Sequence, residues 1–342
     1  MTKEEYLNIF NPTDYPDFLD KYLETATMKR LLHVTQFCGC DYPKLYQPAF
    51  LYTRYFHSLI VAYMTWHFSK NKKETIAALL HDIGTPCFAH TIDYVYGDYI
   101  NQESSEKSLT EMCKRDPLII EYLEEDGMTP QDLENLSKYH ILENNSPRLC
   151  TDRLDGALHT ETVWLNKGKP DELKAIYDDI TILRNEDGLQ EIGFQTLEIA
   201  ELFFSYVGDY AIELQSNKVK FYMQYISAII KAAIEKGIIT IEMLYTYKEE
   251  DIVEILKNNF SSWEQFTEVS EIIETDNFEE ASQWFNVTGP TKNRMINPLV
   301  NINGIPVRIK NTNTYEVQKV LKRIKNNEVP QYAYVKGFKY LK

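Results

Sequence analysis

A histidine followed directly by an aspartate, His81-Asp82, ends an apolar run that a buried helix would carry. The run reads IAALLHDIGTPCFAH, and another histidine, His57, stands 24 residues before His81. Burying an unpaired neutral polar group costs roughly 2–7 kcal/mol, and an unpaired charge costs more. We therefore expect a partner that compensates these side chains, and a bound divalent cation would do so.

The 342 residues can bury a full-sized core, as two domains or as one large domain with an appendage. The composition is 44% hydrophobic and 25% charged, which is ordinary for a soluble globular protein. With 24 Tyr and 16 Phe, the chain has too many aromatic side chains for disorder over its whole length.

The formal net charge of −15 argues against a general nucleic-acid or anionic-membrane binder, because a negative field repels polyanions. The charge is uneven, since residues 301–342 carry nine Lys or Arg against two Glu. This basic stretch has two interpretations. It is a solvated face docked on an acidic body, or it contacts phosphate or another subunit.

The five cysteines form no paired CxxC set, which indicates reduced thiols and a cytoplasmic protein. The first ten residues carry Lys3, Glu4 and Glu5, so we expect no signal peptide. No run of 18 apolar residues occurs, and we expect no membrane span.

Helical patterns dominate, and we predict a mainly α fold: a helical bundle with a small C-terminal α+β lobe. Asn71 with Glu74 resembles a capping box that would begin a helix over 72–83. Further helices are predicted over 129–142 and 147–165, and residues 170–285 are interpreted as helical throughout. Residues 295–310 predict a hairpin, 314–326 a helix and 331–340 a last strand. The predicted parts are an N-terminal segment 1–27, a core 28–170, a helical extension 171–285 and the basic region 286–342.

Four side chains are candidate metal ligands, and imidazole with carboxylate suits a first-row transition ion or Mg²⁺. Arg54 stands three residues before the first of them, so both would point from one helix face. An arginine beside a metal is suited to a phosphate oxygen, since its planar fork binds oxyanions. The four candidate ligands are His57, His81, Asp82 and Asp152.

His90 follows nine residues after His81, and the break at Gly84 and Pro86 would let the chain turn back toward the same pocket. An imidazole is the natural group to move a proton to or from an oxygen near neutral pH. Asp93, one helical turn further on, could fix its tautomer. Alternatively, His90 packs in the core or supports a ligand, and Asp93 is a surface acid.

Three separated segments together resemble the HD-superfamily phosphohydrolases, in particular the deoxynucleoside triphosphate triphosphohydrolases. MKRLLHVTQFCGCDYPKLYQPAFLYTRYFHS resembles the family's opening and its RxxHS segment. HDIGTPCFAHTID resembles the signature HD-x-G-x-x-x-F-x-H-x-x-D, and TDRLDG the later D-[KR]-x-D element. The resemblance covers residues 28–165, close to 40% of the chain.

By this resemblance, the four candidate ligands would hold one divalent ion, Mg, Mn, Fe, Ni or Zn. His90 matches the catalytic histidine and Asp93 the acid that orients it. Arg54 and Arg153 match positions that contact phosphates, with Arg54 also part of the catalytic set. The resemblance also implies a nucleotide substrate and a homo-oligomer.

The chain departs from the family at several positions. Thr85 stands where the family often has a further histidine, which argues against a two-metal site. Gln102 stands where the family has another histidine. Gly156 stands where the family has a tyrosine that packs on the sugar. His159 stands in place of one residue of an Arg-Asp pair.

Asp152, Asp155, Gly156 and His159 have the spacing of a single helical stripe. We therefore expect Asp155, Gly156 and His159 to border the substrate, in a pocket for a different or bulkier arrangement of sugar and base. Alternatively, Gly156 allows close helix packing.

The leading hypothesis is a metal-dependent phosphohydrolase that attacks the α-phosphorus of a (deoxy)nucleoside triphosphate. Hydrolysis of another phosphoester nucleotide, such as a cyclic nucleotide or a monophosphate, is the near alternative. A nucleotide sensor without turnover is a second class, and a nuclease on single strands is a third that the net charge disfavours.

Overall fold

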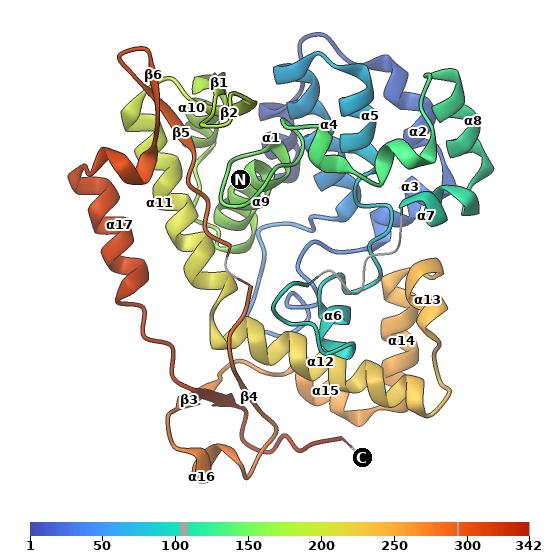
Figure 1. The fold of residues 1–342 in the computed structure, drawn as a ribbon. Helices are drawn as coiled ribbons and strands as arrows, with labels where there is room; N and C mark the ends of the chain where they lie inside the picture. Colours follow the sequence, from blue (N-terminus) through green and yellow to red (C-terminus); the bar gives the residue numbers. More distant parts are fainter. Residues whose placement is uncertain (103–108, 293, 342) are drawn as a thin grey trace.

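The computed structural model describes residues 1–102, 109–292 and 294–341, and it confirms a mainly α fold (Figure 1). The N-terminal half contains nine of the described α-helices. They are α1 (Lys3–Ile9), α2 (Asp20–Leu23), α3 (Ala26–Arg30), α4 (Arg54–Ser69), α5 (Lys72–Leu80), α6 (Thr91–Val95), α7 (Leu109–Arg115), α8 (Pro117–Glu125) and α9 (Thr151–His159).

The C-terminal half adds eight described α-helices and seven short strands. The helices are α10 (Pro170–Asp179), α11 (Leu197–Leu214), α12 (Asn217–Glu235), α13 (Ile241–Thr246), α14 (Glu249–Asn259), α15 (Ser261–Thr267), α16 (Phe278–Ala281) and α17 (Tyr315–Lys325). The strands are β1 (Ile180–Arg184), β2 (Gln190–Phe194), β3 (Ile273–Thr275), β4 (Asn286–Thr288), β5 (Leu299–Ile302), β6 (Ile305–Arg308) and β7 (Tyr332–Tyr334).

Helix α4 lies between the two apolar clusters of the molecule. Its residues Ile60 and Met64 belong to one cluster, which α9 to α12 share, and Val61 and Ala62 belong to the other, which α5 and α8 share. Successive residues of a helix point in different directions, so one helix can serve both clusters. The first turn of α4, which carries His57, is thereby held between the two halves of the fold.

The predicted helix after Asn71 is present, but it ends earlier than expected. The Asn71 side chain accepts hydrogen bonds from the backbone N–H groups of Lys73 and Glu74, as an N-cap does. Helix α5 ends at Leu80 rather than at Ile83, because the chain turns over residues 81–84. His81 and Asp82 therefore lie in a turn at the end of the helix.

The helix predicted over 129–142 is wrong. Two short 3-10 turns, Pro130–Leu133 and Leu136–Lys138, stand in its place. The buried carboxylate of Glu74 accepts the backbone N–H groups of Ile141 and Leu142, at 2.9 and 3.2 Å. These donors cannot also close helical turns, so a tertiary contact overrides the local preference.

The helix predicted over 147–165 begins later than expected. Residues up to Cys150 form a loop, and α9 begins at Thr151. A π-helical turn, Thr160–Trp164, follows α9 directly. The residues of the predicted stripe nevertheless lie on α9.

Two small sheets correct the all-helical interpretation of residues 170–285. One sheet has the order β1-β2-β5-β6 and the other β3-β7-β4. The predicted hairpin is present as β5 and β6, and Asn303 and Gly304 turn with φ of +52° and +87°. Helix α17 is also present, and the last strand is shorter than predicted. Strands of 286–342 pair with β2 and β3 from 171–285, and the four-part division of the chain stays a prediction.

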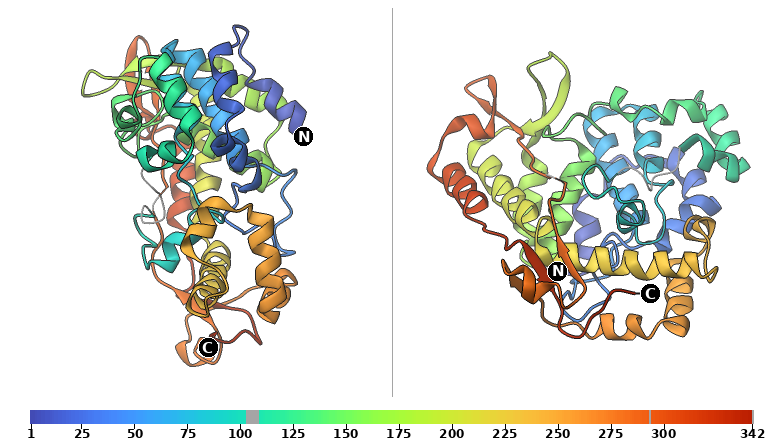
Figure 2. Two further views of the ribbon diagram at one scale, coloured as in Figure 1. Left: turned by 90° about the vertical axis from the view of Figure 1, so that its right-hand side faces the viewer. Right: turned by 60° about the horizontal axis from the view of Figure 1, so that its bottom comes forward.

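Helix α12 runs across the lower part of the view in Figure 1, with α13, α14 and α15 at its end (Figures 1 and 2). It packs against α6, the short helix that follows His90. Within the described ranges, no helix is both long and apolar enough to cross a bilayer.

Candidate active site

The four candidate metal ligands come together from three separate elements. His57 lies in the first turn of α4, His81 and Asp82 follow α5, and Asp152 lies in the first turn of α9. His57 Nε2 lies 3.0 Å from Asp152 Oδ1 and 3.7 Å from Asp82 Oδ2. His81 Nε2 lies 3.7 Å from each of the same two oxygens. Ligand atoms on one ion at about 2.0–2.2 Å are about 3.0–3.5 Å apart, so these spacings suit a single cation.

The Nε2 atom of His81 supports the fit of a metal at this point. It is buried and has no hydrogen-bond partner among the described residues. The other ring nitrogen, Nδ1, lies 2.7 Å from the carbonyl oxygen of Ala78 and donates to it. The lone pair is therefore on Nε2, directed at the carboxylates. A cation held between the imidazole and the carboxylates would satisfy an atom that is otherwise costly to bury.

His57 is held on its far side by a buried carboxylate. Its Nδ1 lies 2.6 Å from Asp155 Oδ2, and Tyr6 and Tyr52 each donate a hydroxyl hydrogen bond of 3.0 Å to Asp155. Burial would lower the pKa of His57, but its hydrogen bonds with Asp152 and Asp155 outweigh burial and raise the pKa to about 10. The surroundings of His57 thus favour positive charge.

Asp82 is shared between the ligand cluster and an arginine. The Arg54 Nη1 atom donates to Asp82 Oδ2 at 2.9 Å, and Thr85 donates to the other oxygen at 3.0 Å. Burial would raise the pKa of Asp82, but the charges of Arg54, His81 and His57 hold it well below its usual range. Asp82 is therefore an anion, as a metal ligand must be.

A cavity of about 360 Å³ opens on this cluster. The size falls within the range of small-molecule sites. One part of its wall is apolar and aromatic, from Tyr94, Trp164, Tyr210, Leu214, Met223 and Met295. The rest carries the ligand cluster and several charged groups, so the cavity suits a molecule with an apolar part and an anionic part.

His90 lies on the wall of the same cavity, as predicted from the chain break before it. Its Nδ1 lies 3.1 Å from the carboxylate of Asp93, which is fully buried. Burial lowers the pKa of His90, and the charges of Arg294 and Arg54 lower it further against the opposing effect of Asp93. A neutral imidazole that donates through Nδ1 keeps the lone pair on Nε2 for the cavity.

The loop before His90 has an unusual backbone. Phe88 and Ala89 have φ of +62° and +44°, in the left-handed region that side chains other than glycine rarely adopt. The buried carboxyl group of Glu249, at the start of α14, accepts the Phe88 N–H at 2.7 Å. The Cys87 N–H donates to the Leu244 carbonyl at 2.8 Å. Residues of α13 and α14 thus hold the backbone that presents His90.

Not all of the residues predicted to contact substrate lie at the cavity. Gly156 and His159 border the cavity, and a Cβ added to Gly156 would have only Tyr210 Oη within 4 Å, at 3.8 Å. Asp155 is fully buried behind His57, so it contacts His57 rather than the cavity. Arg153 borders the cavity, but its guanidinium donates to Glu143 and to two backbone carbonyls of the loop before α9.

Two cationic residues on the wall, Lys292 and Arg294, were not predicted. They belong to the segment between β4 and β5, which contains two prolines and no catalytic motif. The only available signal was a pair of basic residues in a stretch without helical or strand pattern. Gln102, where the family has a histidine, also reaches the cavity.

Comparisons with known proteins place this geometry in context. No protein-family model matches the chain. An uncharacterized protein, YdhJ, from Bacillus subtilis (strain 168) is 26% identical over 241 residues, which cover 70% of each chain. The crystal structure of a phosphohydrolase from Bacteroides thetaiotaomicron VPI-5482 is similar, with a TM-score of 0.62 and 13% identity over 94% of this chain and 95% of that one. The chain therefore has the fold of that phosphohydrolase.

Proposed function

We propose that this protein is a metal-dependent phosphohydrolase of the HD type that acts on a nucleotide. The observation that carries the proposal is the convergence of His57, His81, Asp82 and Asp152, with a buried and unpaired Nε2 on His81, at the wall of a cavity. The same cavity carries His90, the one further histidine that the motif assigns to proton transfer.

When bound, a divalent ion supplies charge neutralisation for a phosphoryl group and acidifies water. The chain's own residues supply the remaining functions. His57, orientated by Asp155, and His81 would hold the ion together with the two aspartates. Arg54, which borders the cavity, would face a phosphate oxygen.

His90 would handle the proton. Its Nε2 lone pair accepts a proton from the attacking water as the oxygen bonds to phosphorus, and Asp93 stabilises the resulting imidazolium. The bond from phosphorus to the leaving oxygen breaks, and that oxygen takes the proton from His90. We further propose that the attack falls on the α-phosphorus of a (deoxy)nucleoside triphosphate, which gives a nucleoside and triphosphate.

The apolar part of the cavity wall supports a substrate with a base and a sugar. Aromatic faces such as those of Trp164 and Tyr210 stack well on planar rings. The open space beside Gly156 accommodates a sugar that a tyrosine there would exclude. The position of Arg153 favours a second candidate, a nucleotide sensor without turnover, because this predicted phosphate contact is engaged with its own loop.

The test is a screen of the purified protein with several divalent metals against nucleoside mono-, di-, tri- and cyclic phosphates. Phosphate, pyrophosphate and triphosphate are measured separately, so that the products identify the bond that breaks. We expect turnover that is lost in His81→Ala and Asp82→Ala. Equal turnover in these variants would indicate a contaminant, and nucleotide binding without any product would favour the sensor.

A further inference from the structure

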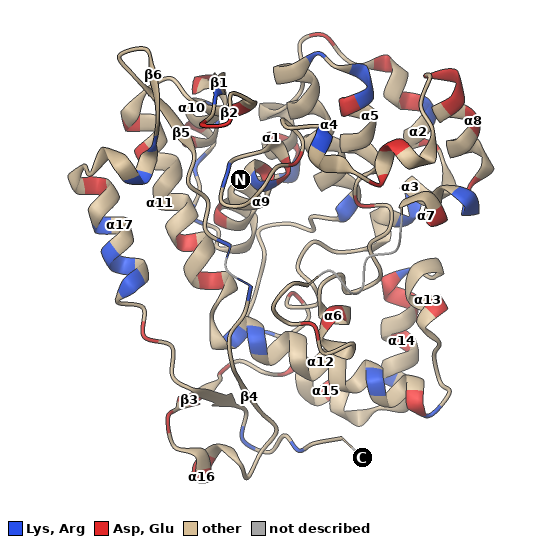
Figure 3. Ribbon diagram, viewed as in Figure 1, with Lys and Arg blue, Asp and Glu red and all other residues tan. Residues whose placement is uncertain are grey.

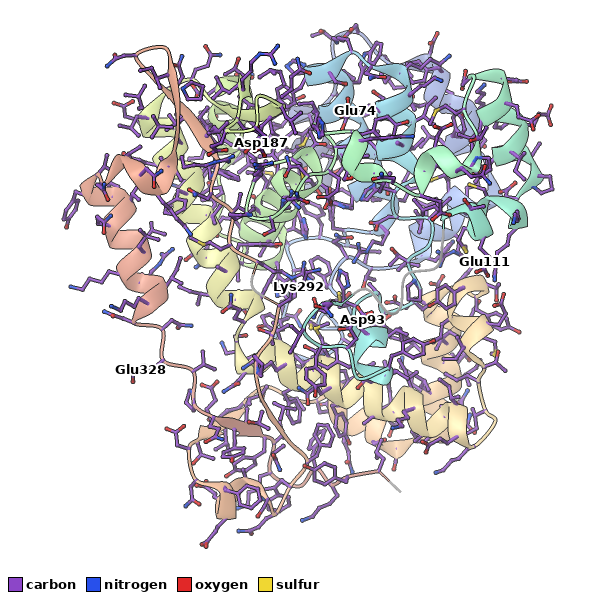
Figure 4. The ribbon with its side chains drawn as sticks, viewed as in Figure 1. Glu74, Asp93, Glu111, Asp187, Lys292 and Glu328 are labelled. Carbon is purple, nitrogen blue, oxygen red and sulfur yellow. The ribbon has the colours of Figure 1, made fainter. Side chains whose placement is uncertain are left out.

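The segment of residues 289–298, of which the structure describes 289–292 and 294–298, brings a distant part of the chain to the cavity. It runs from β4 past α11 to β5 (Figure 1). The Asn297 N–H donates to the Pro147 carbonyl at 2.7 Å, in the loop before α9, and Ile296 is fully buried. The segment is thereby fixed at its β5 end. Basic residues are visible along it in Figure 3, and Lys292 is labelled near the centre of Figure 4, as is Asp93.

Arg294 of this segment lies within the electrostatic reach of the proposed catalytic histidine. Its guanidinium donates a hydrogen bond to the side-chain oxygen of Gln102. The same guanidinium and that of Arg54 both lower the pKa of His90. Arg294 also interacts with the hydroxyl of Tyr210 on α11. These contacts place its charge in the interior of the cavity rather than on the outer surface.

The partners of Arg294 distinguish it from the other arginines of the cavity wall. Arg54 is paired with a carboxylate of the ligand cluster, at 2.9 Å. Arg153 is paired with Glu143, at 2.7 Å. Across the described parts of the chain, no carboxylate lies within 4.0 Å of the Arg294 guanidinium. Among the described residues, its charge therefore has no carboxylate partner.

An uncompensated guanidinium in a half-buried position is costly unless a ligand pairs with it. The protein carries a net charge of −15, so an anionic substrate gains little from the overall field and must find positive charge locally. Arg294 presents a planar fork that binds two phosphate oxygens at once, and Lys292 adds a second cation from the same segment.

We propose that Arg294 and Lys292 form an anion subsite for the phosphate chain of a nucleoside polyphosphate, beyond the phosphate held at the metal cluster. This inference rests on the proposed function and names the substrate class within it. We expect a nucleoside di- or triphosphate to contact both the metal cluster and this subsite, because it carries more than one phosphate, and a monophosphate to contact only one of them. The subsite therefore selects substrates by the number of their phosphates.

The test uses inorganic triphosphate as the probe, with binding measured by calorimetry on the full chain. Arg294→Ala removes a charge-assisted contact, so it should weaken binding about 10- to 100-fold. Arg294→Lys, which keeps the charge and loses the fork, should lie between this variant and the wild type. Lys292→Ala gives a second, independent variant. Arg184→Ala, an exposed arginine on β1, is the matched control and should bind as the wild type does.

The inference is overturned if the wild type binds no triphosphate, or if Arg294→Ala and Lys292→Ala both bind it with unchanged affinity while their melting temperatures match the wild type. The nucleotide screen keeps this outcome separate from failure of the proposed function. No turnover together with weakened triphosphate binding in Arg294→Ala supports the subsite and rejects the hydrolase. Turnover with an unchanged ratio of triphosphate to monophosphate rates in Arg294→Ala rejects the subsite alone.

Discussion

His57 and His90 line or adjoin the same cavity and are both largely buried, but their electrostatic surroundings are opposite. Hydrogen bonds with Asp152 and Asp155 raise the pKa of His57 to about 10 against the effect of burial. Burial and the arginine charges lower the pKa of His90. The neighbours of these two histidines thus shift their pKa values in opposite directions, as in other sites where paired groups are pushed apart in pKa. In the proposed function, the surroundings of His57 would attract a cation and those of His90 would keep a neutral base.

Substitution of a candidate metal ligand should lower turnover more than any other change in the site. His81→Ala removes a ligand atom that nothing else replaces, so turnover should fall roughly 10³-fold, with loss of bound metal. Steady-state rates and metal analysis of the same preparation check this. His33→Ala, whose partner is the exposed Glu250, is the matched control. Retained turnover and bound metal in His81→Ala would show that the cation does not bind at His81.

Substitution of His90 should lower turnover without changing the amount of bound metal. His90→Gln should lower kcat about 10²- to 10⁴-fold, because proton transfer to or from the reacting oxygens is lost. Its metal content should equal that of the wild type. Loss of metal from His90→Gln, in step with the loss of turnover, would mean that His90 also contributes to metal binding.

Substitution of Asp155, the carboxylate behind His57, should have a smaller effect, on metal affinity. Asp155→Asn weakens the hydrogen bond that orients His57, so metal affinity should fall about 10- to 100-fold. Competition with a fluorescent chelator measures the affinity. Asp178→Asn, an exposed acid on α10, should change nothing. Unchanged metal affinity in Asp155→Asn would contradict a supporting role for this residue.

The free energy of unfolding should depend on pH because of Glu249, whose carboxyl group holds the loop before His90. Burial raises the pKa of this carboxyl group to about 8 from its ordinary 4.5, and the charge of Asp41 adds to the effect. At pH values between 4.5 and about 8, Glu249 keeps a proton in the folded state that it has lost in the unfolded state. The contribution of Glu249 to stability is therefore fully present below pH 4.5 and is lost as the pH rises through about 8.

Urea denaturation at a series of pH values tests this directly. The wild-type free energy of unfolding should fall by roughly 1–4 kcal/mol more over this window than that of Glu249→Gln. Gln can still accept the Phe88 N–H, so the variant should remain folded. Parallel pH profiles for the two proteins would argue against a protonated Glu249.

Substitution of Gly156 by alanine should have the smallest effect of these changes. A Cβ there would have one neighbour at 3.8 Å, so Gly156→Ala should fold normally and gain up to about 1 kcal/mol of stability from helix propensity. Gly156→Tyr would fill the cavity and should change the preference among nucleotides. An unchanged substrate profile in Gly156→Tyr, with normal folding, would mean that substrate does not approach α9.

Local sequence patterns predicted much of the helical framework. The cap at Asn71, the helix end near His81 and the hairpin turn at Asn303-Gly304 are set by neighbouring residues, so the sequence alone indicates them. The stripe on α9 likewise follows from its spacing. These features depend on short stretches of chain, and short stretches carry their own signals.

Other features depend on contacts between distant residues and carried no local signal. The 3-10 turns after Thr129 replace a helix because Glu74, more than 60 residues away, takes the backbone donors. Strands β1 and β2 are short and were hidden among helices, since their pairing with β5 is non-local. The same reason explains why Arg294 was missed. Its role arises from the path of residues 289–298 across the fold.

The most direct test of the central claim is a crystal structure of the protein grown with Mn²⁺, with anomalous scattering recorded at the manganese edge. We expect one strong peak per chain, within bonding distance of His57 Nε2, His81 Nε2, Asp82 and Asp152. A peak bound elsewhere, or side chains at this position that coordinate nothing at saturating Mn²⁺, would contradict it.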